Sequence, residues 1–391
     1  MTTLKTLRER HIPFASLRYT TEAFIDYCIP ECAPKFNYAL IGSGVSQNPD
    51  QPVSLRDLHG FQVGGVSMPH GKTNPPHLHF TCEVFICYRG RWKLMWGFDP
   101  GHESAEFGEG DIATVPTWIY RSFTNVGVDD GFMFTALGGD DNGGILWGPS
   151  TLRAAAEQGV HLTEDYRIID ERKGQRIEPG TRMLEPMTPA EIAGLRRWAP
   201  AQMARRIVRF ADLQWSSEAL LDSELPGRGG RMAAVIGLGM AQDRAIEAPV
   251  SNAHGLSIEW LSLPPGGSLS RHRLAEKQVM ILKQGQVELS VEADDGELRQ
   301  SLNGRQTEGW DSFAVPGNCW RSLRNTGADE ALVLLLTSGD HRKRIEWDDE
   351  VVAAAAEAGL VHDASGFIAP RRFVDRGTRT GSVRRRPAPR C

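Results

Sequence analysis

Short runs of apolar or alternating apolar and polar residues recur along most of the chain. EVFICYRGRWKLMWG (83–97) and ALVLLLTSG (331–339) are two examples, and Gly, Pro and Asp residues separate such runs at strand-like intervals. Alternation with this punctuation is typical of β-strands joined by turns. Many short strands with regular turn signals predict a β-sandwich or a β-barrel.

The pattern occurs twice. HGFQVGGVSMPHG (59–71) matches HGLSIEWLSLPPG (254–266) at an offset of 195 residues, and GDIATVPTWIYRSFTN (110–125) matches WDSFAVPGNCWRSLRN (310–325) at an offset of 200 residues. Repeated segments in one register indicate an internal duplication. The change of offset predicts a five-residue insertion in the second copy, which we place at the polar segment 293–306.

One amphipathic helix is expected after each barrel, at 150–159 and 348–359, because each segment begins with Ser or Asp and ends on Gly. A further helix is expected to begin at Thr188, with Pro189 in its first turn. The predicted organisation is an N-terminal extension (1–30), a first barrel (31–170), a linker with a helix (171–205), a second barrel (206–370) and a disordered basic tail (371–391).

Composition adds exclusions. The 391 residues suffice for two domains, and the formal net charge of -5 does not favour nucleic acid or an anionic membrane as a partner. No segment has the apolar length of a membrane span or a secretory signal, and the six cysteines form no CxxC pair. We therefore expect a cytoplasmic protein with reduced thiols, and a homo-oligomer, because exposed sheet edges commonly pair.

Candidate chemistry lies in the first copy, in the pattern Gly71-x5-His77-x-His79-x3-Glu83-x6-Gly90. Residues two apart on a strand point to the same face, so His77 and His79 both project into the barrel. Glu83 follows at an even spacing and can face the same interior. Two imidazoles and a carboxylate suit Fe, Mn, Ni, Cu or Zn and leave coordination positions open.

With Gly110-Asp111-x4-Pro116, this pattern resembles the two signature motifs of the cupin superfamily. The resemblance implies an all-β fold of two tandem double-stranded β-helix (jelly-roll) barrels, a bicupin, with short flanking helices. The segment PTWIYR (116–121) is similar to one in ring-cleaving dioxygenases of the gentisate and salicylate type, which implies Fe(II) as the metal. The family's second motif usually supplies a fourth ligand, a histidine, where this chain has Arg121.

Arginine stays protonated and cannot bind a metal through a lone pair, so two alternatives remain open. Either three ligands hold the metal and Arg121 binds an anionic substrate as the catalytic clamp, or no metal is bound and Arg121 pairs with Glu83. His70 is a potential replacement ligand, although a turn histidine bonded to the backbone is the simpler interpretation.

The second copy lacks the ligand set. His272 matches His77, but Leu274 replaces the second histidine, Gln278 replaces the glutamate, and Arg321 matches Arg121. We interpret these residues as the remnant of a site in a barrel without metal. The equivalent histidines His59 and His254 occur in both copies and are assigned a structural role.

The residues expected to bind substrate beside the metal are Phe85 and Cys87, which share a face with Glu83, and Trp118, Tyr120 and Arg121. Aromatic rings with one fixed cation suit an aromatic or conjugated carboxylate, so the expected partner is a small organic acid. The predicted function is a metal-dependent oxidoreductase, specifically a dioxygenase. The alternatives are a metal-dependent lyase or isomerase that needs no O₂, and a metal-free protein that binds a small anion.

Overall fold

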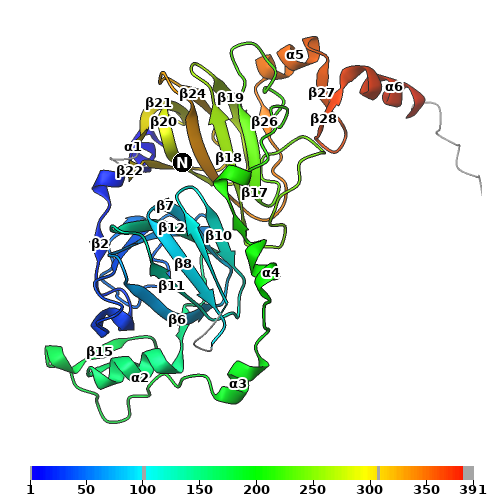
Figure 1. The fold of residues 1–391 in the computed structure, drawn as a ribbon. Helices are drawn as coiled ribbons and strands as arrows, with labels where there is room; N and C mark the ends of the chain where they lie inside the picture. Colours follow the sequence, from blue (N-terminus) through cyan, green and yellow to red (C-terminus); the bar gives the residue numbers. More distant parts are fainter. Residues whose placement is uncertain (1, 99–102, 306–308, 382–391) are drawn as a thin grey trace, which may run out of the picture.

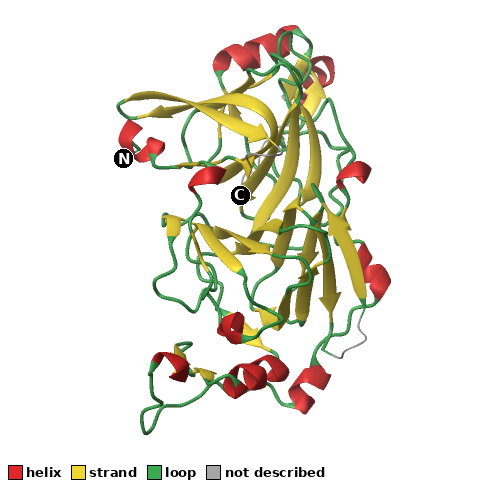
Figure 2. Ribbon diagram, turned by 60° about the vertical axis from the view of Figure 1, so that its left-hand side comes forward, coloured by secondary structure: helices red, strands yellow, loops and turns green. Residues whose placement is uncertain are grey.

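The computed structural model describes residues 2–98, 103–305 and 309–381, and these residues form two β-barrels, one above the other (Figure 1). Strands form the walls of both barrels, and the helices lie at the periphery of the molecule (Figure 2). The predicted all-β fold with few short helices is confirmed. In the described part of the chain, no helix has both the length and the apolar character needed to cross a membrane.

Two facing sheets, antiparallel except for the parallel pair β3–β4, form the first barrel. One has the order β16-β10-β7-β12-β5-β3-β2, with β4 beside β3, and the other has the order β13-β6-β11-β8-β9. The strands of the larger sheet are β2 (Tyr19–Thr20), β3 (Phe36–Ile41), β4 (Val53–Leu55), β5 (Phe61–Met68), β7 (Glu83–Arg89), β10 (Ile112–Val115), β12 (Gly131–Gly138) and β16 (Ile207–Val208). Those of the smaller sheet are β6 (Thr73–His79), β8 (Arg91–Trp96), β9 (Ser104–Gly108), β11 (Arg121–Asn125) and β13 (Ile145–Trp147).

The second barrel repeats this plan within one 11-stranded sheet, whose main path is β17-β18-β25-β20-β24-β19-β26. A single long strand, β20, replaces β7 and β8, and β21 has ten residues where β9 has five. This longer hairpin contains the predicted insertion. The strands are β1 (His11–Ile12), β17 (Arg231–Ile236), β18 (Leu256–Leu263), β19 (Ser268–Arg273), β20 (Gln278–Ala293), β21 (Gly296–Arg305), β22 (Gly309–Trp310), β23 (Ser312–Val315), β24 (Arg321–Asn325), β25 (Ala331–Ser338) and β26 (Glu346–Trp347).

The two barrels exchange short strands. β1, near the N-terminus, pairs with β23 of the second barrel, whereas β16, which follows the linker, pairs with β10 of the first barrel. The barrels also share one apolar core, in which Phe134 of β12 stacks on Trp310 of β22 with ring centroids 5.9 Å apart. Each barrel therefore depends on a strand that lies next to the other barrel in the sequence.

The flanking elements largely follow the expectations. The helices are α1 (Leu4–Arg8), α2 (Pro149–Glu157), α3 (Pro189–Gly194), α4 (Pro200–Ala204), α5 (Asp349–Glu357) and α6 (Arg371–Gly381), and two hairpins consist of β14 (Val160–Leu162) with β15 (Ile168–Asp170) and β27 (Leu360–His362) with β28 (Ile368–Pro370). Asp348 and Thr188 cap α5 and α3 as expected, but α2 begins at Pro149 and has no side-chain cap.

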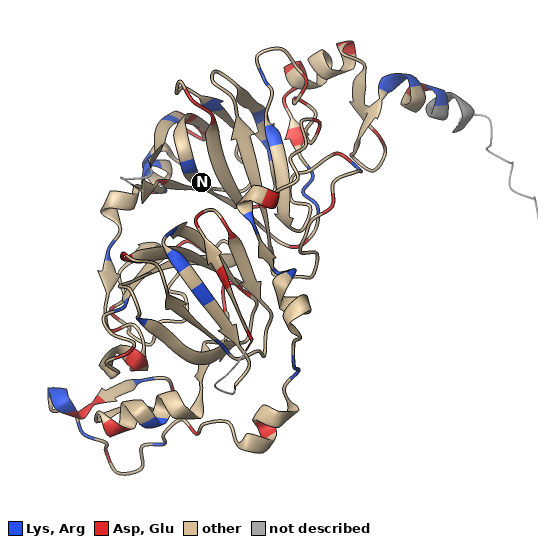
Figure 3. Ribbon diagram, in the orientation of Figure 1, with Lys and Arg blue, Asp and Glu red and all other residues tan. Residues whose placement is uncertain are grey.

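The predicted basic tail differs from the expectation over its first part. Residues 371–381 form α6 instead of a disordered segment. The basic side chains of this helix are arginines, among them Arg371, Arg372 and Arg376, and the helix carries blue segments in Figure 3. The remainder of the predicted tail, 382–391, lies outside the described residues.

The position of α1 leads to the first prediction. Leu7 of α1 is completely buried in the core of the second barrel. Leu7→Ala should lower the free energy of unfolding by about 2–4 kcal/mol, because it leaves a cavity among the core side chains of the second barrel. The N-terminal segment packs there because its strand β1 pairs with that barrel. Urea denaturation measures the loss. Leu58→Ala, at a position 63% exposed, is the control, and a Leu7→Ala loss as small as the control's would contradict this assignment.

Candidate metal centre

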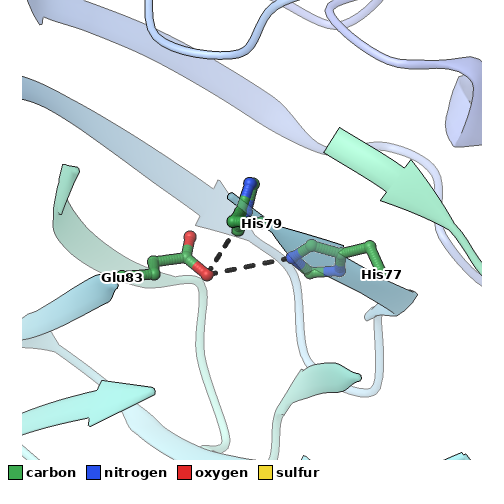
Figure 4. Close-up of side chains that lie close together, drawn as sticks. All are labelled: His77, His79 and Glu83. Carbon is green, nitrogen blue, oxygen red and sulfur yellow. Dashed lines mark ion pairs between the residues drawn. The ribbon is translucent and has the colours of Figure 1, made fainter. Parts of the chain in front are cut away.

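The predicted ligands His77, His79 and Glu83 meet inside the first barrel. The two histidines lie at the end of β6 and the glutamate begins β7, and all three are at least 94% buried. One ligand atom from each residue lies within 4.8 Å of the others, and the side chains point toward one another (Figure 4). Among the described residues, this is the one group of His, Cys, Asp and Glu side chains with such a geometry.

Hydrogen bonds to the backbone orient both imidazoles. Nδ1 of His77 lies 2.8 Å from the carbonyl oxygen of Pro75, and Nδ1 of His79 lies 3.2 Å from that of Gly144. A carbonyl oxygen only accepts, so each Nδ1 carries the proton and each Nε2 presents a lone pair. Burial lowers the pKa of both histidines, that of His79 to about 3, which keeps the rings neutral.

The two Nε2 atoms face a carboxylate oxygen that has no hydrogen-bond partner. Oε2 of Glu83 lies 3.9 Å from Nε2 of His77 and 3.4 Å from Nε2 of His79. Three lone pairs thus converge in a buried space, where an unpaired polar atom is costly. A cation among these atoms would satisfy all three at once, so the residues present fit a divalent metal ion.

Arg121 begins β11, opposite His77 in the β6–β11 ladder, and is completely buried. Its Nη2 donates to the carbonyl oxygen of Pro116 at 2.7 Å, whereas Nη1 lies 3.8 Å from Oε2 of Glu83, which is too long for a hydrogen bond. Burial lowers the pKa of Arg121 to about 10, and the guanidinium stays charged at neutral pH. Arg121 therefore forms a long ion pair with Glu83 but no hydrogen bond, so this oxygen of Glu83 has no hydrogen-bond partner.

A small cavity of about 80 Å³ adjoins the three ligands. Its wall includes the polar side chains of Asn37, Gln51, Gln62, Asn74 and Thr135. Gly64 of β5 also lines it, and a Cβ at this position would lie 3.0 Å from Oγ1 of Thr135. The absence of a side chain at residue 64 thus keeps this space open.

The residues expected to bind substrate do not line this cavity. Phe85 and Cys87 lie deeper in the apolar core of the barrel, and burial raises the pKa of the Cys87 thiol. Tyr120 is buried with its hydroxyl unpaired, and burial raises its pKa to about 12. Trp118 is 43% exposed and lines a different groove. Of the predicted set, only Arg121 lies next to the ligands.

His70, His59 and His254, the other first-barrel and repeat histidines considered in the sequence, each contact a backbone carbonyl oxygen through Nδ1. Nδ1 of His70 lies 2.5 Å from the carbonyl oxygen of Gly127, on the surface and away from the ligands. His59 and His254 each direct Nδ1 to a carbonyl oxygen two residues earlier, at 2.6 and 2.7 Å, in keeping with the structural role assigned to them.

A buried polar chain behind His77 was not anticipated. Lys35 donates to Asp26 at 2.5 Å and also to Oδ1 of Asn74. Nδ2 of Asn74 lies 3.0 Å from Nδ1 of His77, but both atoms are donors, so this contact is not a hydrogen bond. These three residues are at least 95% buried. No spacing in the sequence indicated them, because the N-terminal segment approaches β6 only in the folded chain.

The second barrel has the remnant residues but no site. Nδ1 of His272 lies 2.8 Å from the carbonyl oxygen of Ser270, Gln278 donates to Oγ1 of Thr337 at 2.8 Å, and Arg321 donates to backbone carbonyl oxygens. Glu259 stands at the position of Gly64 of the first barrel and is completely buried, so a side chain is present where the first barrel has none.

Comparisons with known proteins bear on the fold. No family model and no curated protein matches the chain, but solved structures do. They include the oxalate decarboxylase–formate complex of Lactobacillus farciminis (13% identity, 88% of this chain and 89% of that one, TM-score 0.53). A variant oxalate decarboxylase of Bacillus subtilis (12%, 97% and 88%, 0.53) and the 7S globulin of Momordica charantia (11%, 87% and 86%, 0.51) also match.

This chain has the bicupin fold. At such low identity the likeness shows the fold alone, and bicupin proteins as different as a decarboxylase and a globulin share it. The predicted resemblance to gentisate and salicylate dioxygenases is not supported by these neighbours. Any function of the bicupin must therefore be argued from its own site.

Glu259 leads to a prediction for the second barrel. Burial raises the pKa of Glu259 from 4.5 to about 8, although the backbone N–H of Met240 donates to the carboxylate. The folded state thus holds this proton more tightly than the unfolded state, and stability falls as the pH rises from about 4.5 to 8.

Glu259→Gln should remove this loss of stability. At pH 9 the variant should be more stable than the wild type by on the order of a few kcal/mol, whereas at pH 5 it should not be. Denaturation at both pH values tests this, with exposed Glu157→Gln as the control; an equal effect at both pH values would contradict it.

Proposed function

We propose that the first barrel binds one divalent transition-metal ion through His77, His79 and Glu83 and is the catalytic half of a metal-dependent enzyme. The single observation that carries the proposal is the convergence of three lone pairs on one buried point. In a metal-free pocket, two neutral imidazoles would direct their lone pairs at a carboxylate, which is repulsive. The same ligand types accommodate Fe(II), Mn, Ni, Cu or Zn.

The size of the cavity favours a small substrate. A cavity of about 80 Å³ is about half the size of the roughly 150 Å³ apolar cavity known to hold benzene. Such a space suits an acid of a few heavy atoms better than an aromatic ring. The amide and hydroxyl side chains of its wall can bind the oxygen atoms of such an acid.

We therefore favour a lyase that needs no O₂ and acts on a small, oxygen-rich carboxylic acid. The named neighbours include oxalate decarboxylases, whose two-carbon substrate is of this size class. The metal, when bound, would polarise a carboxylate or carbonyl oxygen of the substrate. The barrel wall would exclude bulk water, and the buried charge of Arg121 would favour an anion in the cavity.

A dioxygenase is the second candidate. Two histidines and one carboxylate, with open positions, also form the ligand set of non-haem Fe(II) oxygenases. Turnover of small acids under anaerobic and aerobic conditions separates the two candidates. The lyase should work equally well without O₂ and release CO₂, whereas a dioxygenase should consume O₂ in proportion to product.

Metal affinity tests the centre itself. His77→Ala and His79→Ala should each weaken metal binding more than about 100-fold, because even the loss of an outer partner of a ligand costs roughly 10–100-fold. Arg121→His should strengthen binding, since it replaces a repelling charge by a potential fourth ligand. Elemental analysis and calorimetric titration of the metal measure these changes.

Arg321→His is the matched control, because Arg321 is equally buried at the equivalent position of the barrel that lacks the ligands. It should leave metal affinity unchanged. Wild-type protein that takes up no transition metal at micromolar concentration would overturn the proposal.

Gly64 provides a test of the cavity. Gly64→Ala places a methyl group in the cavity wall, away from the ligand atoms, and should raise KM about tenfold or more, the usual effect of one methyl group in a tight pocket. Metal content should stay at the wild-type level. Unchanged KM for every accepted substrate would show that substrate binds elsewhere.

A further inference from the structure

Trp118 has a backbone conformation that does not suit it. Its φ is 60°, and the equivalent residue of the second barrel, Asn318, has a φ of 59°. Asparagine tolerates this left-handed region, whereas a bulky aromatic residue there is strained. The indole is 43% exposed and packs on one ring, that of Phe80, with centroids 5.0 Å apart. Burial therefore does little to offset the strain, and residues strained in this way concentrate at functional sites.

Trp118 lines a groove of about 770 Å³ between the two barrels. Trp198, in the linker between α3 and α4, lines the same groove, and the guanidinium of Arg196 lies 4.5 Å from the centroid of its ring. Residues 252–255 of the second barrel complete the wall. Both the volume and the mixture of aromatic, small and a few polar side chains are typical of small-molecule sites.

The groove carries a net positive charge. Arg196 is exposed, and within the described residues no carboxylate lies within 4.0 Å of it. Arg206 is bound to polar groups, such as Oδ1 of Asn252 at 2.7 Å. Asp141 is the acidic residue among those that line the groove. An unpaired guanidinium beside an indole ring offers a carboxylate a charge-assisted partner and an aromatic ring a stacking surface.

We propose that this groove is a second binding site, separate from the metal centre, for a planar aromatic carboxylate. The ring of the ligand packs against Trp118 and Trp198, and its carboxylate pairs with Arg196. This role explains why the indole of Trp118 is kept exposed on a strained backbone. It also takes the kind of ligand that the cavity of the first barrel is too small to hold.

Calorimetric titration with salicylate tests the site, on protein stripped of metal by a chelator. Salicylate should bind with a Kd in the micromolar to low millimolar range, and Trp118→Asn and Arg196→Gln should each weaken binding at least about tenfold. Cyclohexanecarboxylate, which has the charge without the flat ring, and phenol, which has the ring without the charge, should bind at least about tenfold more weakly than salicylate.

Two controls separate recognition from stability and location. Trp118→Asn should leave Tm within a few degrees of the wild type, because asparagine occupies the equivalent turn without strain. Asn318→Gly, in the second barrel, should leave salicylate binding unchanged. The proposal is overturned if salicylate does not bind, if both Trp118→Asn and Arg196→Gln bind it as the wild type does, or if His77→Ala abolishes binding, since the ligand would then lie in the first barrel.

Discussion

The hydrogen bonds from two imidazoles to backbone carbonyl oxygens determine what the first barrel can bind. Because Pro75 and Gly144 accept the Nδ1 protons, the Nε2 lone pairs of His77 and His79 have one direction left, toward Glu83. The barrel fixes these carbonyl groups at the end of β6 and in the loop before β13. The orientation of the ligands is thus a consequence of backbone geometry and does not depend on the ion.

The second barrel shows what happens when this arrangement is not maintained. His272 still directs Nδ1 to a backbone carbonyl oxygen, yet Leu274 and Gln278 leave its Nε2 without a converging partner. The buried side chain of Glu259 stands there in place of the glycine that lines the cavity of the first barrel. Burial raises the pKa of Glu259. Ionisation of this buried carboxyl group at high pH therefore lowers the stability of the second barrel. The duplication has produced one open and one filled barrel.

The sequence predicted the fold and the ligand triad because both depend on local periodicity. A spacing of two residues places His77 and His79 on one face of a strand, and the constant offsets between copies follow from the conserved lengths of strands and turns. Periodicity gives the face of a residue but not its depth, so Phe85 and Cys87 face inward, as Glu83 does, but lie in the apolar core. The backbone N–H of Trp118 donates to the carbonyl oxygen of His79, but its side chain lines a different groove, and its residue type gave no reason to expect the left-handed conformation.

Long-range arrangements were beyond the reach of the pattern. The exchange of β1 and β16 and the chain from Asp26 through Lys35 to Asn74 join segments far apart in the sequence. A strand of two residues carries too little periodicity to be recognised, and its partner is selected only by packing. The same limit applies to Arg121. The sequence showed that an arginine replaces the histidine of the family pattern, but it did not show where the guanidinium group lies.

That position constrains any metal in the first barrel. Nη1 of Arg121 lies 3.8 Å from the same oxygen of Glu83 that would bind the ion, so a dication and a guanidinium share one carboxylate. The two positive charges would repel each other across this buried carboxylate. A substrate carboxylate in the cavity would offset that repulsion, and linkage then requires that metal and anion each raise the affinity of the other. We therefore expect an ion bound in this barrel to be held more tightly when an anionic substrate fills the cavity.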